Sequence, residues 1–418
     1  MNVSLIGDLA IVGIFQSGDD NVSNVTQSGF ATNATNLAIF ATVGVTRTGD
    51  RNTVDVVQNG TFISGNLSVE NTFRLLQSGD DNIATIDQAG LNPEARVTQS
   101  GNSNLSDIDQ AGTEMRAFVN QLGYSNESGI DQTALTGVNN PATVTQGGDN
   151  NLSNIIQAAV DTTADVNQSG ADNQSAITQS GSLDLAVVRQ PGDDNESSVV
   201  QGGALNLITV SQSGDENFSN LKQAGSDHDT TVTQSGDLNE SFINQLGPGG
   251  LNNSLAVTQS GDENLSNVHQ GGSNHIATIT QGGDLNEGSL IQSGNDNRTT
   301  ISQAGDDNFG PVAPTGTDDF AFISQIGDSN GAFISQIGAA GAVNTASITQ
   351  GGDHNLGNVT QSNSDQTATA TQSGNLNNSQ ITRTGGSNMA SVTQASDANS
   401  SFISQGGMGN NVTVTQGF

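Results

Sequence analysis

The sequence predicts an all-β fold, a flat two-sheet parallel β-solenoid of the cross-β type, with about 22 residues per coil and roughly 18–19 coils. Three observations predict it. Glutamines recur every eleven residues over most of the chain, polar and apolar residues alternate between them, and alternate units differ in a way that doubles the true period.

Each eleven-residue unit has the pattern of one strand followed by one turn. In the segment Asn239-Glu-Ser-Phe-Ile-Asn-Gln245, one face carries Asn239, Ser241, Ile243 and Gln245, an alternation of period two that is typical of a strand. The following residues include Gly247, which supplies the backbone freedom that a tight arc needs. We therefore expect a strand of seven residues and a turn of four in each unit.

The slot six residues before each glutamine indicates two strands per coil. From residue 82 onward every second unit has Asn in this slot, whereas the intervening units also hold Pro, Met, Thr, Asp or His. A coil of two strands stacks each set on itself, and at about 4.8 Å per coil the stack makes a rod of about 90 Å. Stacked amides can then hydrogen-bond along buried ladders. The ladder residues singled out are Asn104, Gln110, Asn151, Gln157, Asn195, Gln201, Asn217, Gln223, Asn239, Gln245, Asn264, Gln270, Asn377, Asn399 and Gln405.

Two regions depart from this frame. Residues 1–76 hold irregular repeats, and residues 77–418 form the regular solenoid continuous with them. The stretch 309–320 places Pro311 where a strand should run, so we expect a bulge there. Pro314 and Arg383 occupy two slots in which the frame expects glutamine.

Composition excludes several classes of function. With 9 basic against 42 acidic residues, nucleic acid is not an expected partner. No apolar run approaches the roughly 18 residues of a membrane helix, so membrane insertion is not expected. Without cysteine there are no disulfides or thiolate metal sites. The four histidines are scattered and a rod has no cleft, so we expect no enzyme, no catalytic or metal site and no cofactor.

The first and last units lack a charged or helical cap. The first unit has Ala10, Val12, Ile14 and Gln16 on one face, and the last has Asn410, Val412, Val414 and Gln416. Uncapped strand edges template further strands, and a soluble monomeric solenoid is normally capped. We therefore expect end-to-end polymerisation, with these eight residues at the polymerisation edges.

The frame Gln-x-Gly-x-x-Asn-x-Ala/Ser-x-x-x-Gln, as in residues 234–245, resembles the curlin repeat. It recurs over nearly all of residues 77–416 and more loosely before them. The resemblance implies a secreted bacterial subunit of a curli-type functional amyloid fibre at the cell surface, which builds biofilm matrix and mediates adhesion. As partners it implies further copies of the chain, a nucleator subunit and a dedicated outer-membrane secretion pore.

Other interpretations share this fold. A surface adhesin would be a single rod that does not polymerise. An ice-binding protein would use outward Thr-x-Thr arrays, which Arg96 and Phe118 interrupt. The acidic turns are either a solvated edge that opposes sideways aggregation or a divalent-cation edge, since calcium prefers carboxylate oxygens. The paired acids of these turns include Asp80-Asp81, Asp193-Asp194, Asp215-Glu216, Asp262-Glu263 and Asp306-Asp307.

Overall fold

The computed structural model describes residues 2–6, 10–31, 39–62, 69–133, 139–338 and 343–417. These residues form strands, bridges, bends and turns, with no helix among them. Within this part of the chain no helix is therefore long and apolar enough to span a membrane. The chain divides into two compact units, Met1–Leu205 and Asn206–Phe418, and both are built in the same way.

The first unit contains strands β1 to β17. They are β1 (Asn2–Ile6), β2 (Ala10–Ser17), β3 (Val22–Ala31), β4 (Ile39–Thr48), β5 (Thr53–Phe62), β6 (Val69–Ser78), β7 (Ile83–Leu91), β8 (Glu94–Ser100), β9 (Leu105–Thr113), β10 (Arg116–Leu122), β11 (Glu127–Gln132), β12 (Pro141–Gln146), β13 (Leu152–Gln157), β14 (Thr163–Gln168), β15 (Gln174–Gln179), β16 (Leu185–Gln190) and β17 (Glu196–Ala204).

The second unit contains strands β18 to β36. They are β18 (Leu207–Gln212), β19 (Phe218–Ser226), β20 (Asp229–Gln234), β21 (Glu240–Leu251), β22 (Ser254–Gln259), β23 (Leu265–Ser273), β24 (Ile276–Gln281), β25 (Glu287–Asn295), β26 (Arg298–Gln303), β27 (Phe309–Pro314), β28 (Phe320–Gln325), β29 (Gly331–Ile337), β30 (Thr345–Gln350), β31 (Leu356–Ser364), β32 (Thr367–Gln372), β33 (Asn378–Gly386), β34 (Met389–Gln394), β35 (Ser400–Gln405) and β36 (Asn411–Gln416).

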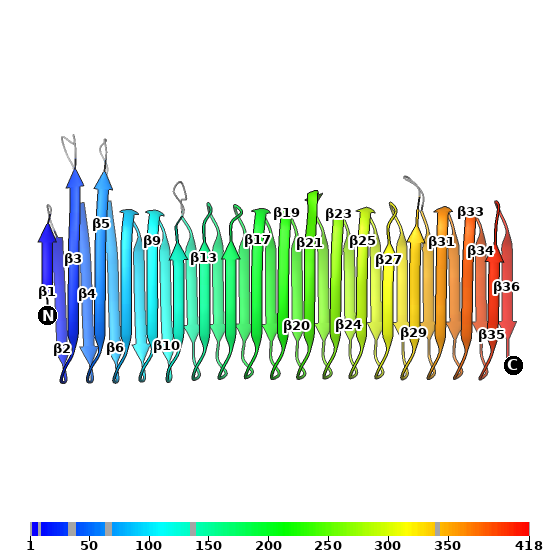
Figure 1. The fold of residues 1–418 in the computed structure, drawn as a ribbon, viewed down its shortest axis with the longest axis horizontal. Coiled ribbons are helices and arrows are strands. Elements are labelled where there is room, and N and C mark those ends of the chain that lie inside the picture. The colour runs from blue at the N-terminus through cyan, green and yellow to red at the C-terminus, as the bar shows by residue number, and fades with distance from the viewer. Residues whose placement is uncertain are drawn as a thin grey trace. The chain divides into compact units, whose positions relative to one another are not determined.

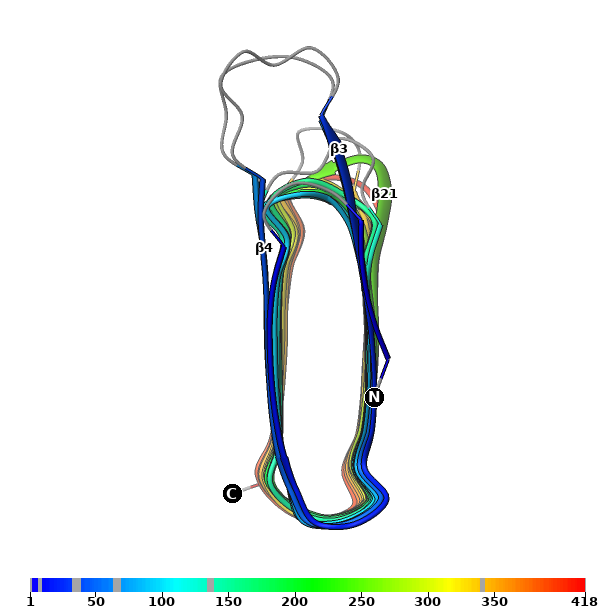
Figure 2. The ribbon, with the colours of Figure 1, turned by 90° about the vertical axis from the view of Figure 1, so that its left-hand side faces the viewer.

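Within each unit the odd-numbered strands pair into one parallel sheet and the even-numbered strands into another, here called the odd sheet and the even sheet. The two sheets face each other and are joined by arcs at both ends of the strands (Figure 2). Odd- and even-numbered strands run in opposite directions (Figure 1). The described residues form thirty-six strands, which at two per coil agrees with the 18–19 coils expected, so the predicted two-sheet parallel β-solenoid is confirmed.

The pairing register follows the 22-residue period of the sequence. Ile108 lies beside Ile130, and Glu94 beside Arg116. A three-residue insertion lengthens the step without changing the register, since Arg116 pairs with Pro141. Each side chain therefore lies on its counterpart in the neighbouring coil, which is the condition for a ladder.

The irregular N-terminal residues obey the same register. Gln16 pairs with Arg47 and Arg47 pairs with Gln77, although these residues are 31 and 30 positions apart. The additional residues fall between β3 and β4 and between β5 and β6. The sequence frame is lost there because more residues separate the strands, whereas the strands keep their partners.

The core is one thin layer of side chains between the two sheets. In β13 the buried residues are Ser153, Ile155 and Gln157, and the residues between them face outward. The same alternation of buried and outward residues recurs in the other strands, for example β22 and β30. Apolar burial is therefore limited largely to one or two small or branched side chains per strand, and the buried amides must satisfy one another.

A residue in the left-handed αL conformation lies immediately before the Asn slot in almost every described turn. Examples are Ser103 with φ 60° and Leu238 with φ 56°. Asp and Asn accept this conformation at lower cost than most residues, whereas a leucine carries a penalty of about 1–2 kcal/mol. Sequence reasoning assigned the turn to glycine alone and did not identify this second position.

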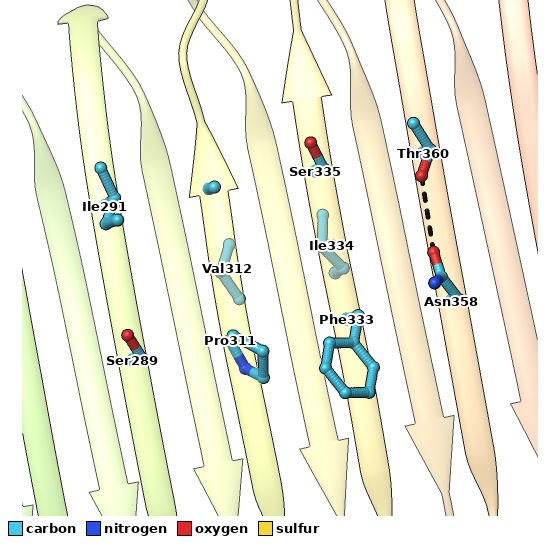
Figure 3. A pocket seen from close by; sticks show the side chains of 10 residues that line it. Ser289, Ile291, Pro311, Val312, Phe333, Ile334, Ser335, Asn358 and Thr360 are labelled. Atoms are coloured by element: carbon cyan, nitrogen blue, oxygen red, sulfur yellow. Dashed lines mark hydrogen bonds between the residues drawn. The ribbon is translucent and has the colours of Figure 1, made fainter.

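The bulge predicted at Pro311 is wrong. Strand β27 keeps the common register, with Val312 beside Leu290 on one side and Ile334 on the other. Pro311 lies on the outer face, where it interrupts the pairing with β29 at Gly310 and Pro311 only. Proline removes its own N–H from the ladder, and the neighbouring coils hold the strand in place. A shallow depression of about 290 Å³ lies over Pro311, beside Phe333 (Figure 3).

We predict that Gly101→Ala lowers the free energy of unfolding by about 2 kcal/mol or more. Gly101 has φ +119°, and an added Cβ would lie 2.0 Å from the carbonyl oxygen of Gly123 in the next coil. Urea denaturation followed by circular dichroism measures the loss.

The matched control is Gly129→Ala. Its Cβ would meet only the side-chain oxygen of Asn154, at 3.2 Å, and that side chain can move. Equal unfolding midpoints for the two variants would contradict the assigned role of the Gly101 turn.

Candidate assembly interface

The buried glutamines form hydrogen-bonded ladders in both sheets. In the odd sheet Gln157 Nε2 donates to Gln179 Oε1 at 3.0 Å, and Gln179 Nε2 donates to Gln201 Oε1 at 2.9 Å. The remaining N–H of Gln179 reaches the carbonyl oxygen of Thr163 in the facing sheet, at 2.9 Å. Each amide thus joins two coils and both sheets, with its donor directed toward the C-terminal coil.

The asparagines form a second ladder with the opposite polarity. Asn151 donates to Asn126 Oδ1 through its backbone N–H at 3.0 Å and through Nδ2 at 3.1 Å. Asn151 Nδ2 also donates to the carbonyl oxygen of Gly170, in the turn of the next coil, at 2.8 Å. The asparagine oxygen therefore faces the C-terminal coil as an acceptor, and the side chain closes the turn.

The predicted ladder residues occupy these buried positions. In the first unit Asn104, Gln110, Asn151, Gln157, Asn195 and Gln201 are fully buried. In the second unit Asn217, Gln223, Asn239, Gln245, Asn264, Gln270 and Asn377 are buried to the same degree. Near the C-terminal edge the burial declines, since Asn399 is half-buried and Gln405 is 5% exposed.

Two arginines replace glutamine inside the ladders. Arg47 lies between Gln16 and Gln77 and donates to the Ser23 hydroxyl and to the carbonyl oxygen of Asn52. Arg383 donates to the carbonyl oxygens of Thr367 and Asn388. Burial lowers the pKa of both arginines to about 10. Each arginine interrupts its ladder, because a guanidinium offers no acceptor to the preceding glutamine.

Histidine and aspartate replace asparagine in some slots of the even sheet. His275 Nδ1 accepts the backbone N–H of Asn297 at 3.3 Å, so Nε2 carries the proton and reaches the carbonyl oxygen of Gly271. Burial lowers the pKa of His228 and of His275. Asp319 Oδ1 accepts hydrogen bonds from the backbone N–H and from Nδ2 of Asn344. Burial raises the pKa of the Asp319 carboxyl.

The acidic turns contain a third ladder, which sequence reasoning missed. In most of these turns the aspartate after the glycine accepts a backbone N–H from the preceding coil, as Asp306 Oδ1 does from Asp284 at 2.9 Å and Asp328 Oδ1 does from Asp306 at 3.0 Å. The signal was present, because Asp or Asn follows the glycine in most of these turns. In the described residues no group of three or more potential ligands could hold a metal ion.

The last coil leaves its inner face partly open. Val412, Val414 and Gln416 are half-buried and Asn410 is exposed, whereas the corresponding residues of inner coils are buried. Gln416 accepts from Gln394 at 2.9 Å, but no described coil follows to accept from it. Among the described strands β36 pairs with β34 alone, and an edge strand can pair with a further strand through its backbone groups.

The first coil presents the complementary edge. Val12, Ile14 and Gln16 of β2 are half-buried, and β2 pairs with β4 on one side only among the described strands. The backbone of Ala10 continues this strand, while its side chain lies outside the described part. In the odd sheet Leu5 holds the register position of Gln27, so that ladder begins at Gln27.

Comparison with known families gives one match. A sequence profile described as the curlin associated repeat matches eight segments that together cover more than half of the chain. No curated protein matches the chain. The matched segments are residues 69–101, 79–112, 92–123, 203–236, 250–283, 277–305, 316–352 and 385–417.

We predict that Gln179→Leu destabilises the solenoid by about 2–6 kcal/mol, because it leaves buried partners of two or more hydrogen bonds unsatisfied. The control is Gln174→Leu, since Gln174 lies on the same strand but is exposed. Urea denaturation of the two variants measures the difference, and equal midpoints would show that the buried amide contributes no stability.

We predict that stability falls as the pH drops below about 6.5. His228 and His275 have lowered pKa values in the folded chain, so the unfolded chain binds protons more readily. The stability is therefore present above the unfolded pKa and is lost as the pH falls through it, by up to about 1.4 kcal/mol per pH unit for each histidine.

Urea midpoints between pH 7.5 and 5 measure this loss. The variant His228→Asn with His275→Asn restores the common slot residue and should flatten the profile. An equally steep profile in that variant would assign the loss to other groups.

Proposed function

Because the chain belongs to the curlin-repeat family, we propose that it is the structural subunit of an extracellular curli-type amyloid fibre, whose copies add end to end through their edge strands. The proposed fibre lies at the bacterial cell surface, where it builds biofilm matrix and mediates adhesion. The family and the solenoid fold are structural in character, and the proposal assigns the chain no catalytic role.

The open inner face of β36 carries this proposal. Its ladder residues repeat the pattern of most inner strands, yet they are half-buried or exposed. In the interior the same pattern is covered by the next coil, as Val392 is by Val414. A further strand with this pattern would bury apolar surface at roughly 25 cal/mol per Å² and complete the ladder.

Strand β2 of a second copy offers such a pattern. If the common register continues, Gln416 meets Gln16, Val414 meets Ile14, and Val412 meets Val12. Asn410 meets the position of Ala10, where the backbone N–H can still donate to the asparagine oxygen. In the odd sheet Gln405 meets Leu5, so the junction lacks an amide there as well as at Ala10.

Other partners are proposed from the family alone. A nucleator subunit would supply a first template for the open edge. A dedicated outer-membrane pore would export the chain before it folds. Neither partner is required by the edge geometry, because a folded copy presents the same pattern of strand groups as a template.

An ice-binding function receives less support. Thr278 stacks on Thr300, but the next residue in that column is Phe322. A regular hydroxyl surface therefore extends over few coils. The alternative function is that of a rod-shaped adhesin that does not polymerise. The polymerisation assay described next distinguishes it from the proposed fibre subunit.

The first test is incubation of the purified chain at neutral pH, followed by thioflavin fluorescence and electron microscopy. Unbranched fibres with a reflection at about 4.8 Å along the axis are expected. A chain that stays soluble for days at high concentration would overturn the proposal and favour the adhesin.

We predict that Asn410→Lys with Gln416→Lys slows elongation at least tenfold, because both charges would have to be buried between two coils. Thr413→Lys with Thr415→Lys is the matched control, since both residues lie on the same strand and face outward. Seeded growth rates measure the effect, and equal slowing by both pairs would argue against β36 as a growing edge.

A further inference from the structure

Opposite charges lie on the two outer faces of the same coils in the first unit. The even sheet carries an arginine patch, formed by Arg74 on β6, Arg96 on β8 and Arg116 on β10. These are three of only nine basic residues in the chain, and all are exposed. They lie on consecutive strands of the even sheet, with Arg74 directly beside Arg96.

The odd sheet carries an aspartate patch, formed by Asp87 on β7, Asp107 and Asp109 on β9, and Asp131 on β11. Asp87, Asp109 and Asp131 form one column, since each pairs with the next across the sheet. Burial, together with Asp131, Asp87 and Asp107, raises the pKa of Asp109. The column thus consists of like charges, and in the described strands its neighbours at the two ends are Val57 and Ile156, which carry no charge.

Within the described part of the chain the aspartate patch takes part in no ion pair, and the arginine patch is paired at Arg96 alone. Among the described residues the ion pairs are Arg51 with Asp81, in a turn, and Arg96 with Glu94 at 2.6 Å. The Arg96 guanidinium also lies over the Phe118 ring, 5.4 Å from its centroid. Arg74, Arg116 and the four aspartates are left available to an outside partner.

We infer that the arginine patch of one copy docks on the aspartate patch of a second copy lying beside it with the same orientation. A copy shifted along the normal of the sheets by about 20 Å, which is two sheet spacings of about 10 Å, brings its odd sheet against the even sheet of its neighbour. Both surfaces repeat at the same strand spacing, so a charge match in one coil recurs in the next.

The two patches also lie at the same position along the strand direction, here called their height. Gln110, at the end of the inward run of β9, donates to the carbonyl oxygen of Glu94 at the start of β8. Because the sheets run in opposite directions, Arg116 lies at the height of Asp109 and Asp131. By the same relation Arg96 lies at the height of Asp107.

The overall charge of −33 opposes contact between copies at long range. At 0.15 M salt this repulsion is screened beyond about 8 Å, whereas opposite charges in contact still attract. Most side-by-side arrangements of two such acidic copies are repulsive. The patches therefore favour the one arrangement in which arginines face aspartates. Since the two patches differ, the contact does not close into a dimer and can add copies on both sides.

This lateral contact goes beyond the proposed end-to-end fibre and does not depend on it. The first variant combines Arg74→Glu, Arg96→Glu and Arg116→Glu. The second combines Asp87→Lys, Asp109→Lys and Asp131→Lys. Each variant alone should associate laterally at least about tenfold more weakly than the native chain, from three lost contacts at about two- to fivefold each, and a mixture of the two should restore association.

Sedimentation velocity of the freshly dissolved full chain at 0.15 M salt measures lateral association before fibres grow. Filament width in micrographs measures it after they have grown. A failure of end-to-end growth leaves the sedimentation result intact, so the two proposals fail separately. The matched control combines Arg189→Glu, Lys222→Glu and Arg298→Glu, which makes the same change in net charge at exposed sites outside the patch.

Loss in both patch variants, restoration on mixing and an unchanged control are the expected results. Three results would each overturn the inference. They are patch variants that associate as the native chain does, a mixture that fails to restore association, and a control that weakens association as much as the arginine variant.

Discussion

Hydrogen bonds between identical amides in successive coils are the interaction on which this structure depends. A buried carboxamide needs partners for two donors and an acceptor, and a thin core offers few that are unlike itself. Exact repetition of the register solves this, because the rung above accepts what the rung below donates, as Gln157, Gln179 and Gln201 do. The register therefore cannot slip by one residue without exposing the amides and burying the outward side chains.

This constraint divides the chain into fixed and free positions. Inward residues and turn residues must fit the coils above and below, whereas outward residues face solvent and contact only their neighbours on the same face of the sheet. The replacements inside the ladder follow the same logic. His275 still supplies an acceptor and a donor, and Asp319 supplies acceptors, whereas Arg383 supplies donors only and breaks the chain of bonds. Variation in charge and size is therefore concentrated on the faces of the sheets.

Much of the fold could be predicted because the structural repeat has the same period as the repeat of residue types along the sequence. The glutamine spacing and the invariant Asn slot of every second unit gave the strand, the coil of two strands and the ladder residues. The turn details could not be obtained in this way. The αL conformation of Leu238 and the acceptor role of Asp306 depend on backbone geometry, which residue type alone does not specify. Pro311 was misjudged because a local rule about proline was applied to a strand held by neighbours on both sides.

The polarity of the ladders constrains any assembly of copies along the solenoid axis. Glutamine donors are directed toward the C-terminal coil, and asparagine acceptors face the same way. A C-terminal edge therefore offers glutamine donors and asparagine acceptors, and an N-terminal edge offers the reverse. Two like edges would place donor against donor and acceptor against acceptor, and would also lose the parallel strand pairing. Copies that add along the axis must then add head to tail, so a fibre built from this chain has two chemically different ends.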